Sequence, residues 1–475
     1  MNGNDEWDVI VSGGNVVLRD QVCAADIGIK DGKIAAVAPR LEGKAGKTIE
    51  AAGMLVLPGV VDMHVHLDEP GLGEWEGFVS GSAALAAGGC TSYADMPLNG
   101  LPPTVNAEAL ALKLEAERKS GGSRVDFALW GGLVPGNRED LSGLAEAGVV
   151  GFKAFMSSPG DTGEGCFRNV DDEELYEGMR RIASLGKVLA IHAESEAIVS
   201  SLTAAKTEAG ALTMRDYLES RPPDAELEAV RTALELAARS GCSLHVVHVS
   251  APEAIRLISE AKRSGLDATA ETCPHYLVFT DEDVVRIGAK AKCSPPIRGA
   301  REREELWALL AAGEIDIIAS DHSPCPPDLK EVEGGDYFRA WGGISCAQST
   351  LELILSEGWL KRGIPLTVLS RAMSAAPAAR LGLRGKGLIE AGYDADLAIV
   401  DPRGGYTLTA ADLKYRHPHS AYEGYVLGCR VAATLLRGET VYSRPDNAGV
   451  PENEGEKGAL GRRLIPVQAV PFAEI

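Results

Sequence analysis

The sequence lacks the features that would place it in a membrane, on nucleic acid or in a disulfide scaffold. No run of its 475 residues approaches the ~18 consecutive apolar residues of a membrane span. Its 47 basic and 68 acidic residues give a net charge of −21, which disfavours nucleic acid and anionic membranes as partners. The nine cysteines form no Cys-x-x-Cys pair and no apolar leader precedes them, so we expect a reduced, cytoplasmic chain.

The two ends of the chain share one pattern. Each has short, β-branched apolar runs separated by glycine turns, such as Gly13-Gly14 and Asp31-Gly32, which is typical of strands. The runs are Asp8–Ser12, Asn15–Leu18, Ala25–Lys30 and Ile34–Val37 near the start, and Asp396–Val400, Arg430–Arg437 and Val441-Tyr442 near the end. We therefore predict that residues 1–57 and 381–475 pair into one composite β-domain.

Between Pro58 and Arg380, short apolar strands alternate with amphipathic helical stretches, which predicts a parallel βα architecture. The predicted strands are Val60–Leu67, Thr91–Met96, Asp126–Gly131, Gly151–Phe155, Val188–His192, Ser243–Val249, Asp267–Glu271 and Asp316–Asp321. The clearest predicted helices are Asn106–Lys119, Asp172–Ser184, Ala225–Ser240, Pro252–Ser264 and Arg301–Ala312. Eight such strands in about 320 residues favour an α/β fold of the (β/α)8 barrel type over an open sheet.

Polar residues at the ends of these strands predict a metal site. Catalytic groups in a (β/α)8 barrel project from the C-terminal ends of the strands. His64 and His66 are two apart on the first strand, so both side chains point to the same face. The full set of predicted ligands is His64, His66, Lys153, His192, His248 and Asp321.

Each of these residues also has a structural interpretation. A single histidine is more often a hydrogen-bonded core residue than a ligand, Asp321 could cap a helix, and Lys153 could extend its amine to the rim. His245 and His248 face opposite sides of their strand, so only His248 is assigned to the site. The remaining histidines, given structural roles, are His275, His322, His417 and His419. Coincident packing explains the whole set poorly, so we predict a binuclear centre.

The ligand types indicate the chemistry. Imidazoles and a carboxylate, without cysteine ligands, favour zinc in an open site and also accept cobalt, manganese or iron. Two such cations would lower the pKa of Lys153, and its neutral amine could add carbon dioxide to form a bridging carbamate. Two metals ~3.5–4 Å apart activate a shared water, and Asp321 would carry its proton to a leaving nitrogen. The predicted reaction is hydrolysis of an amide-like bond.

The segment Pro58-Gly-Val-Val-Asp-Met-His-Val-His-Leu resembles the opening motif of the cyclic amidohydrolases, which include dihydroorotases, hydantoinases (dihydropyrimidinases) and allantoinases. The resemblance covers nearly the whole chain. It implies a (β/α)8 barrel with a composite β-sandwich built from both termini, and it supports the six ligands one by one, with Lys153 N6-carboxylated. It also implies a homo-oligomer, with a tetramer expected by analogy.

Within that family the resemblance is greatest to the allantoinases, through segments such as Lys292-Cys-Ser-Pro-Pro-Ile-Arg and Ala340-Trp-Gly-Gly-Ile. Asp68 stands where dihydroorotases carry a carboxylate-binding arginine, and Ser158 where hydantoinases carry a tyrosine. The resemblance implies hydrolysis of the ring amide of allantoin to allantoate, with backbone groups near Ser294 and Gly342 holding the ring.

Two alternatives stay open. A hydantoinase or dihydropyrimidinase type of cyclic-imide hydrolase would use the same ligands on a smaller ring. A non-catalytic scaffold homologue would belong to another class of protein, but such proteins characteristically lack several ligands, and all six are present here.

Overall fold

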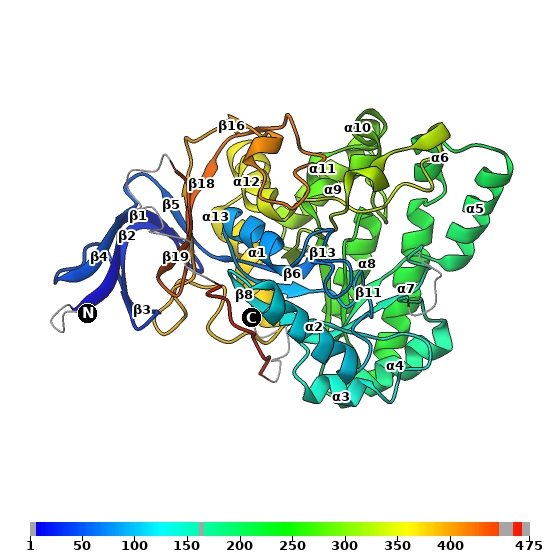
Figure 1. The fold of residues 1–475 in the computed structure, drawn as a ribbon, viewed down its shortest axis with the longest axis horizontal. Helices are drawn as coiled ribbons and strands as arrows, with labels where there is room; N and C mark the ends of the chain where they lie inside the picture. Colours follow the sequence, from blue (N-terminus) through cyan, green and yellow to red (C-terminus); the bar gives the residue numbers. More distant parts are fainter. Residues whose placement is uncertain (1–5, 161–165, 446–458, 468–475) are drawn as a thin grey trace.

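Eight parallel strands in the middle of the chain close into a barrel, as predicted (Figure 1). The computed structural model describes residues 6–160, 166–445 and 459–467. The strands are β6 (Val60–Val65), β7 (Cys90–Asp95), β8 (Asp126–Leu129) continued by β9 (Gly131–Gly132), β10 (Gly151–Phe155), β11 (Val188–His192), β12 (Ser243–Val246), β13 (Ala268–Thr272) and β14 (Ile317–Ile318). Almost every residue in them is buried, because the barrel interior and the outer helices cover both faces.

The barrel closes through backbone contacts at two seams. On one side, the Val150 amide, just before β10, donates to the Leu129 carbonyl of β8 at 3.0 Å. On the other side, the His66 amide donates to the His322 carbonyl at 2.8 Å, next to a parallel bridge between Val65 and His322. The first and last strands are therefore neighbours, and their C-terminal ends share one rim.

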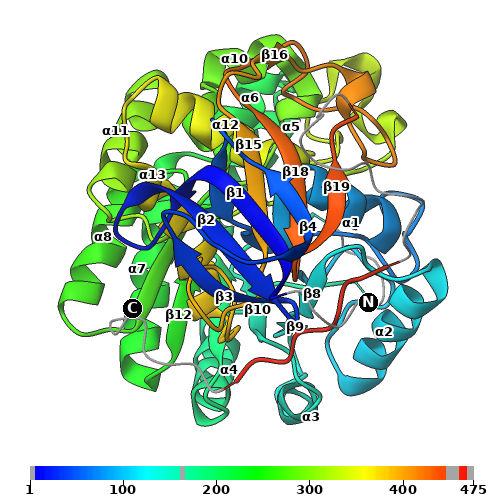
Figure 2. The same ribbon diagram turned by 90° about the vertical axis from the view of Figure 1, so that its left-hand side faces the viewer.

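Helices follow the strands and surround the barrel (Figures 1 and 2). The helices of the βα units are α1 (Phe78–Ala87), α2 (Ala107–Ser120), α3 (Leu141–Glu146), α4 (Asp172–Ser184), α7 (Pro223–Ser240), α8 (Pro252–Arg263) and α11 (Ala300–Ala311), with α12 (Thr350–Ile354), α13 (Leu366–Ser370) and α14 (Ala376–Arg380) after the last strand. A capping box between Asp171 and Glu174 starts α4, and its apolar stripe is buried against the barrel.

Several helices were not predicted, and four of them lie between β11 and α11. These four are α5 (Glu196–Glu208), α6 (Met214–Glu219), α9 (Pro274–Val278) and α10 (Asp281–Ile287). Helix α5 buries only Val199, so its sequence has no apolar stripe to indicate a helix. Both α5 and α6 lie in the long connection after β11, and Tyr217 of α6 reaches the candidate site.

The two ends of the chain form one eight-stranded sheet, which confirms the predicted composite domain (Figure 2). Its strands are β1 (Trp7–Val17), β2 (Val22–Lys30), β3 (Lys33–Ala38), β4 (Ala45–Glu50), β5 (Leu55–Pro58), β15 (Leu397–Asp401), β18 (Arg430–Leu436) and β19 (Glu439–Ser443). The antiparallel pair of β5 and β15 joins the N-terminal strands to the C-terminal ones. Apolar residues from both ends form a separate core.

The predicted turn at Gly13-Gly14 is wrong. One strand, β1, runs through both glycines, and its register with β2 shifts between Val11 and Gly14, as at a β-bulge. Gly13 has a φ of +71°, and a Cβ on Gly14 would come within 2.5 Å of Val56. The glycines therefore bend a continuous strand. The short strands β4 and β5 were not predicted.

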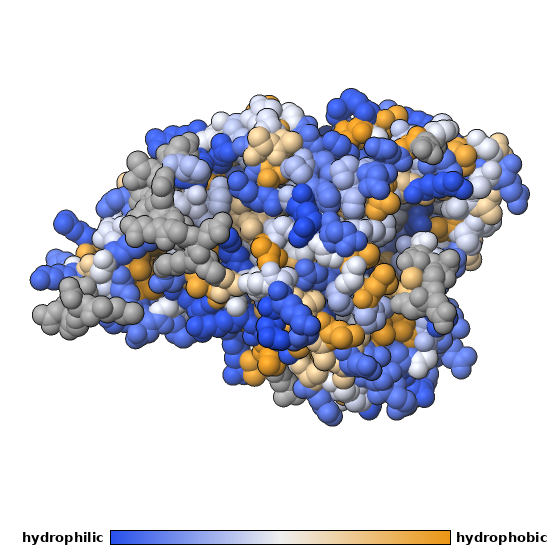
Figure 3. Space-filling view, viewed as in Figure 1, coloured by the Kyte–Doolittle hydropathy of each residue, from blue (hydrophilic) through white to orange (hydrophobic). Residues whose placement is uncertain are grey.

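The surface agrees with the acidic composition. Hydrophilic side chains cover most of the face seen in Figure 3, and apolar ones are interspersed among them. Within the described ranges, no helix has both the length and the apolarity that crossing a lipid bilayer would require.

Candidate metal centre

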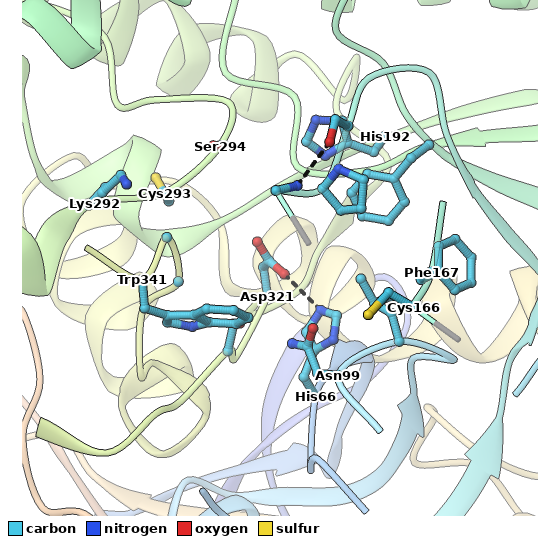
Figure 4. Close-up of a pocket in the computed structure, with 18 of the residues that line it drawn as sticks. His66, Asn99, Cys166, Phe167, His192, Lys292, Cys293, Ser294, Asp321 and Trp341 are labelled. Carbon is cyan, nitrogen blue, oxygen red and sulfur yellow. Dashed lines mark hydrogen bonds and ion pairs between the residues drawn. The ribbon is translucent and has the colours of Figure 1, made fainter. Parts of the chain in front are cut away.

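A cavity of about 600 Å³ opens at the C-terminal ends of the barrel strands. Its wall includes all eight residues predicted for the site. These are His64, His66, Lys153, His192, His248, Asp321, Ser294 and Gly342. The close-up in Figure 4 shows Asp321 pointing into the cavity toward His66, with His192 and Ser294 on other parts of the wall.

Three of the predicted ligands converge closely. The Asp321 Oδ1 atom lies 3.1 Å from His64 Nε2 and 3.4 Å from His66 Nε2. One donor atom from each of the three residues lies within 4.8 Å of the others, which is close enough for a shared metal ion. Since β6 and the segment after β14 are neighbours, barrel closure creates this cluster.

The other three predicted ligands lie beside it. His192 Nδ1 is 3.1 Å from His248 Nε2, and the His64 and His248 rings are 5.5 Å apart. Phe155 stacks on the His192 ring at 4.6 Å, which fixes the ring's orientation. Lys153 Nζ lies 5.0 Å from the centre of the Phe155 ring and has no hydrogen-bond partner in the described chain.

The surroundings set the charges of these groups. Burial lowers the pKa of Lys153 to about 8, although Asp321 and Glu271 oppose the shift. Burial also lowers the pKa values of His66, His192 and His248, so neutral imidazoles are favoured at pH 7. Burial alone would raise the pKa of Asp321, but the nearby imidazoles, first that of His64, lower it to about 2.

The donor set fits divalent cations. Neutral imidazoles and a carboxylate are the protonation states that bind metals. Among the described residues, the buried Lys153 amine has no partner, and neither has Nδ1 of His66 or of His248. An unpaired buried polar group is costly unless something binds it. None of the six predicted ligands is a cysteine, so the set does not favour a closed structural zinc site.

Two of the predicted ligands have strained backbones. His248 has a φ of +40° and Asp321 a φ of +46°, in the left-handed region that side-chain-bearing residues rarely adopt. His248 lies two residues after the end of β12, and Asp321 lies three residues after the end of β14. Such strain persists only where the surrounding structure enforces it, and it often marks functional positions.

Residues behind the cavity orient the imidazoles, and the sequence analysis missed them. Glu271, on β13, accepts from His64 Nδ1 at 2.8 Å and from the His248 backbone amide at 3.0 Å. Glu194 is 2.8 Å from His192 Nε2 and 2.6 Å from Arg221 Nη1. Glu271 sits at a strand end and Glu194 lies two residues after His192, so position alone could have indicated both.

The two predicted substrate contacts lie on loops beside the ligands. The Ser294 hydroxyl is 2.6 Å from the Tyr217 hydroxyl, so Tyr217 fixes its rotamer. The N–H and C=O groups of Gly342 have no partner among the described residues, and a Cβ there would meet no atom within 4 Å. Gly342 therefore has backbone groups available to a bound molecule, whereas the Ser294 hydroxyl is already engaged with Tyr217.

Aromatic side chains form part of the remaining wall. They are Trp75, Trp341, Phe155, Phe167, Tyr217 and Phe338, and the cations Arg221 and Arg339 also line the cavity. Trp75 and Trp341 meet edge to face at 4.8 Å. Ser158 lines the cavity, whereas Asp68 is buried and is not part of the wall. Burial, together with the nearby carboxylates of Asp95 and Glu76, raises the pKa of Asp68 well above its ordinary value.

The histidines assigned structural roles lie outside the cavity wall. His245 is 2.9 Å from the Thr269 hydroxyl and 3.2 Å from Glu271 Oε2. The His322 ring accepts from the Cys346 amide, while His417 and His419 contact backbone carbonyls. His275 is buried, and neither of its ring nitrogens has a partner in the described chain.

Comparison with known proteins gives consistent results. The model of the amidohydrolase family matches residues 55–441. The allantoinase of Rubrobacter xylanophilus is 53% identical over 92% of this chain and 94% of its own length. The allantoinase of Bacillus velezensis is 50% identical over 97% and 98%. The solved L-hydantoinase (dihydropyrimidinase) from Arthrobacter aurescens matches with a TM-score of 0.90 and 35% identity, covering 97% of this chain and 100% of that one.

Proposed function

Because the chain belongs to the amidohydrolase family and is a hydrolase acting on a cyclic amide, we propose that its substrate is allantoin. It hydrolyses the ring amide to release allantoate, and it uses a binuclear metal centre. The observation that carries the proposal is the convergence of His64, His66 and Asp321 beside an unpartnered Lys153 amine.

Six residues would hold the two divalent ions. They are His64, His66, Lys153, His192, His248 and Asp321. Zinc is the favoured metal, and cobalt, manganese and iron suit the same ligands. The metals would supply a Lewis acid for the ring carbonyl and lower the pKa of a water molecule toward ~7.

Lys153 contributes as its carbamate. Its depressed pKa keeps part of the amine neutral near pH 8, and a neutral amine adds carbon dioxide. The product is an anion with two oxygens, which suits a bridge between two cations. Intact-protein mass spectrometry under native conditions should show the added mass of one carbon dioxide. A bare amine in a fully active sample would refute this part.

Asp321 moves the proton. Its pKa of about 2 keeps it ionised at neutral pH, so it can accept a proton from the attacking water. Water adds to the ring carbonyl carbon, the carbon–nitrogen bond breaks, and Asp321 returns the proton to the leaving nitrogen. Gly342 and the backbone near Ser294 hold the amide edge of the ring meanwhile.

A substrate panel tests the assignment. Turnover of allantoin, hydantoin, dihydrouracil and dihydroorotate should be measured on one preparation whose metal content is also determined. We expect allantoin to have the highest kcat/KM, with about two metals per chain. Allantoin turning over no faster than hydantoin would overturn the choice of substrate.

A hydantoinase activity is the second candidate, because the match to the L-hydantoinase structure extends over nearly the whole of both chains. The same panel decides between the two. A scaffold without metals would leave the purified protein nearly metal-free even after growth with added zinc or manganese. We further propose a homotetramer, which light scattering should reveal as four times the chain mass.

A further inference from the structure

One wall of the cavity is a segment without helix or strand hydrogen bonding, Phe338–Gly343. It supplies Phe338, Trp341 and Gly342 to the wall. Three of its amides have partners: the Phe338 amide donates to Asp336 Oδ1, the Trp341 amide to the Leu329 carbonyl and the Gly343 amide to the Lys292 carbonyl. Four of its carbonyls are bound as well, and two lysines supply the donors.

Two lysines bind four of those carbonyls. Lys292 Nζ donates to Phe338 O at 3.1 Å and to Ala340 O at 2.5 Å, and it lies 4.5 Å from the centre of the Tyr217 ring. Lys330 Nζ donates to Trp341 O at 2.9 Å and to Gly343 O at 2.5 Å. Its third donor goes to Ala289 O at 3.0 Å.

Neither lysine has an acidic partner within ion-pair distance among the described residues. An ammonium group has three donors, so Lys330 uses all of its capacity on carbonyl oxygens. Hydrogen bonds to a charged group are stronger than neutral ones. The arrangement therefore serves to fix a backbone shape.

The pattern of bonds singles out one residue. Carbonyls on either side of Gly342, those of Trp341 and Gly343, are bound to Lys330, while the N–H and C=O of Gly342 have no partner in the described chain. We propose that Lys292 and Lys330 are positioning residues, which clamp this segment so that Gly342 and Trp341 face the substrate. The segment predicted to hold the ring is thus shaped by two buried lysines, of which Lys292 also lines the cavity and Lys330 does not.

Hydrogen–deuterium exchange tests the clamp without any substrate. In the wild-type holoenzyme, peptides covering residues 338–343 should exchange more slowly than those covering residues 331–336, although neither segment is in an α-helix or strand. Lys330→Met and Lys292→Met should raise exchange in 338–343 and leave the barrel strands protected. Equal exchange of the two wild-type segments would overturn the proposal.

Steady-state kinetics tests whether the clamp affects substrate binding, and this test rests on the proposed function. Each Met variant should raise the KM for allantoin roughly 10- to 100-fold, because charged hydrogen bonds of this strength are lost, while kcat and metal content change little. Lys330→Arg, which keeps the charge, should recover part of the loss. Lys290→Met is the control, since Lys290 lies two residues before Lys292 but pairs with Glu423 on the surface.

Together, the exchange and kinetic measurements distinguish failure of the clamp from failure of the proposed function. If allantoin is not turned over, the proposed function fails, yet the exchange result still decides the clamp. If exchange rises only in the Met variants while the KM of the compound that is turned over stays unchanged, the positioning role is refuted. If the Met variants do not fold, exchange in the two wild-type segments still supports or overturns the clamp.

Discussion

Two clusters at opposite ends of the barrel are close enough in geometry to hold a metal ion, and they differ in what fills them. His64, His66 and Asp321 lie at the C-terminal rim, whereas Asp126, at the start of β8, meets Asp394 and Asp396 beside the terminal sheet. The second cluster already contains a cation. Lys386 Nζ lies 2.6 Å from Asp126, 2.9 Å from Asp394 and 2.6 Å from Asp396.

The comparison shows that proximity of acidic groups is a poor guide to a metal site. The three aspartates have three cations as counter-ions, namely the buried Lys386, Arg437 at Asp126 and Lys33 at Asp394, so nothing further is needed to neutralise them. The rim cluster instead has two imidazoles, a single carboxylate and a neighbouring amine without a partner among the described residues, and burial lowers the pKa of His66. Polar groups at the rim lack partners among the described residues, whereas the aspartates near the terminal sheet are paired. This difference distinguishes a site suited to catalysis from a structural junction.

The largest effect is expected at the rim. Asp321→Asn removes the group that accepts and returns the proton, so kcat should fall by roughly 10²- to 10⁴-fold. Steady-state turnover of allantoin measures it, together with metal analysis of the same sample. Asp328→Asn is the control, because Asp328 is exposed in the same connection. A variant that kept more than a tenth of the activity would contradict the role of Asp321.

At the structural junction around Lys386, a substitution should change only the stability of the fold. Lys386→Met leaves three carboxylates without their buried counter-ion, so the free energy of unfolding should drop by about 3–5 kcal/mol. Lys33→Met is a matched control, because Lys33 also pairs with Asp394, at 2.7 Å, but is half exposed and should cost at most about 1 kcal/mol. Denaturant unfolding gives both values. Loss of metal from folded Lys386→Met would break the distinction.

The direction of the pKa shift of Lys386 determines how this stabilisation depends on pH. The three carboxylates raise the pKa of Lys386 above its ordinary value of 10.5, although burial opposes them. A raised pKa contributes stability that is fully present below the unfolded value and is lost as the pH rises through the folded one. The difference in the free energy of unfolding between wild type and Lys386→Met should therefore not fall between pH 7 and 9, because Lys386 stays protonated over that range. A steep fall in that range would contradict the ion cluster.

A smaller effect is expected behind the rim. Glu271→Gln keeps the shape of the side chain but removes the charge that holds His64 and the His248 backbone, so metal affinity should fall roughly 10- to 100-fold. Competition with a chelator measures the affinity directly. Glu260→Gln, on the exposed face of α8, should leave it unchanged. Unaltered affinity in Glu271→Gln would mean that the imidazoles need no such support.

Much of the barrel could be predicted because its strands are continuous apolar runs with polar residues at their ends. Placing Lys153 and Asp321 on one rim required only strand order, since parallel strands bring their ends together. The partners of Glu271 and the Lys330 clamp could not be predicted, because each joins segments that only the closed fold brings together. Helix α5 escaped prediction for another reason, since its burial of Val199 alone leaves no periodic signal.

Anomalous X-ray scattering at the zinc edge, from crystals of protein purified with zinc, tests the central claim most directly. We predict two peaks at the rim, bracketed by His64, His66, His192, His248, Asp321 and Lys153, and none beside Lys386. A single peak, no peak, or a peak among Asp126, Asp394 and Asp396 would contradict the binuclear centre.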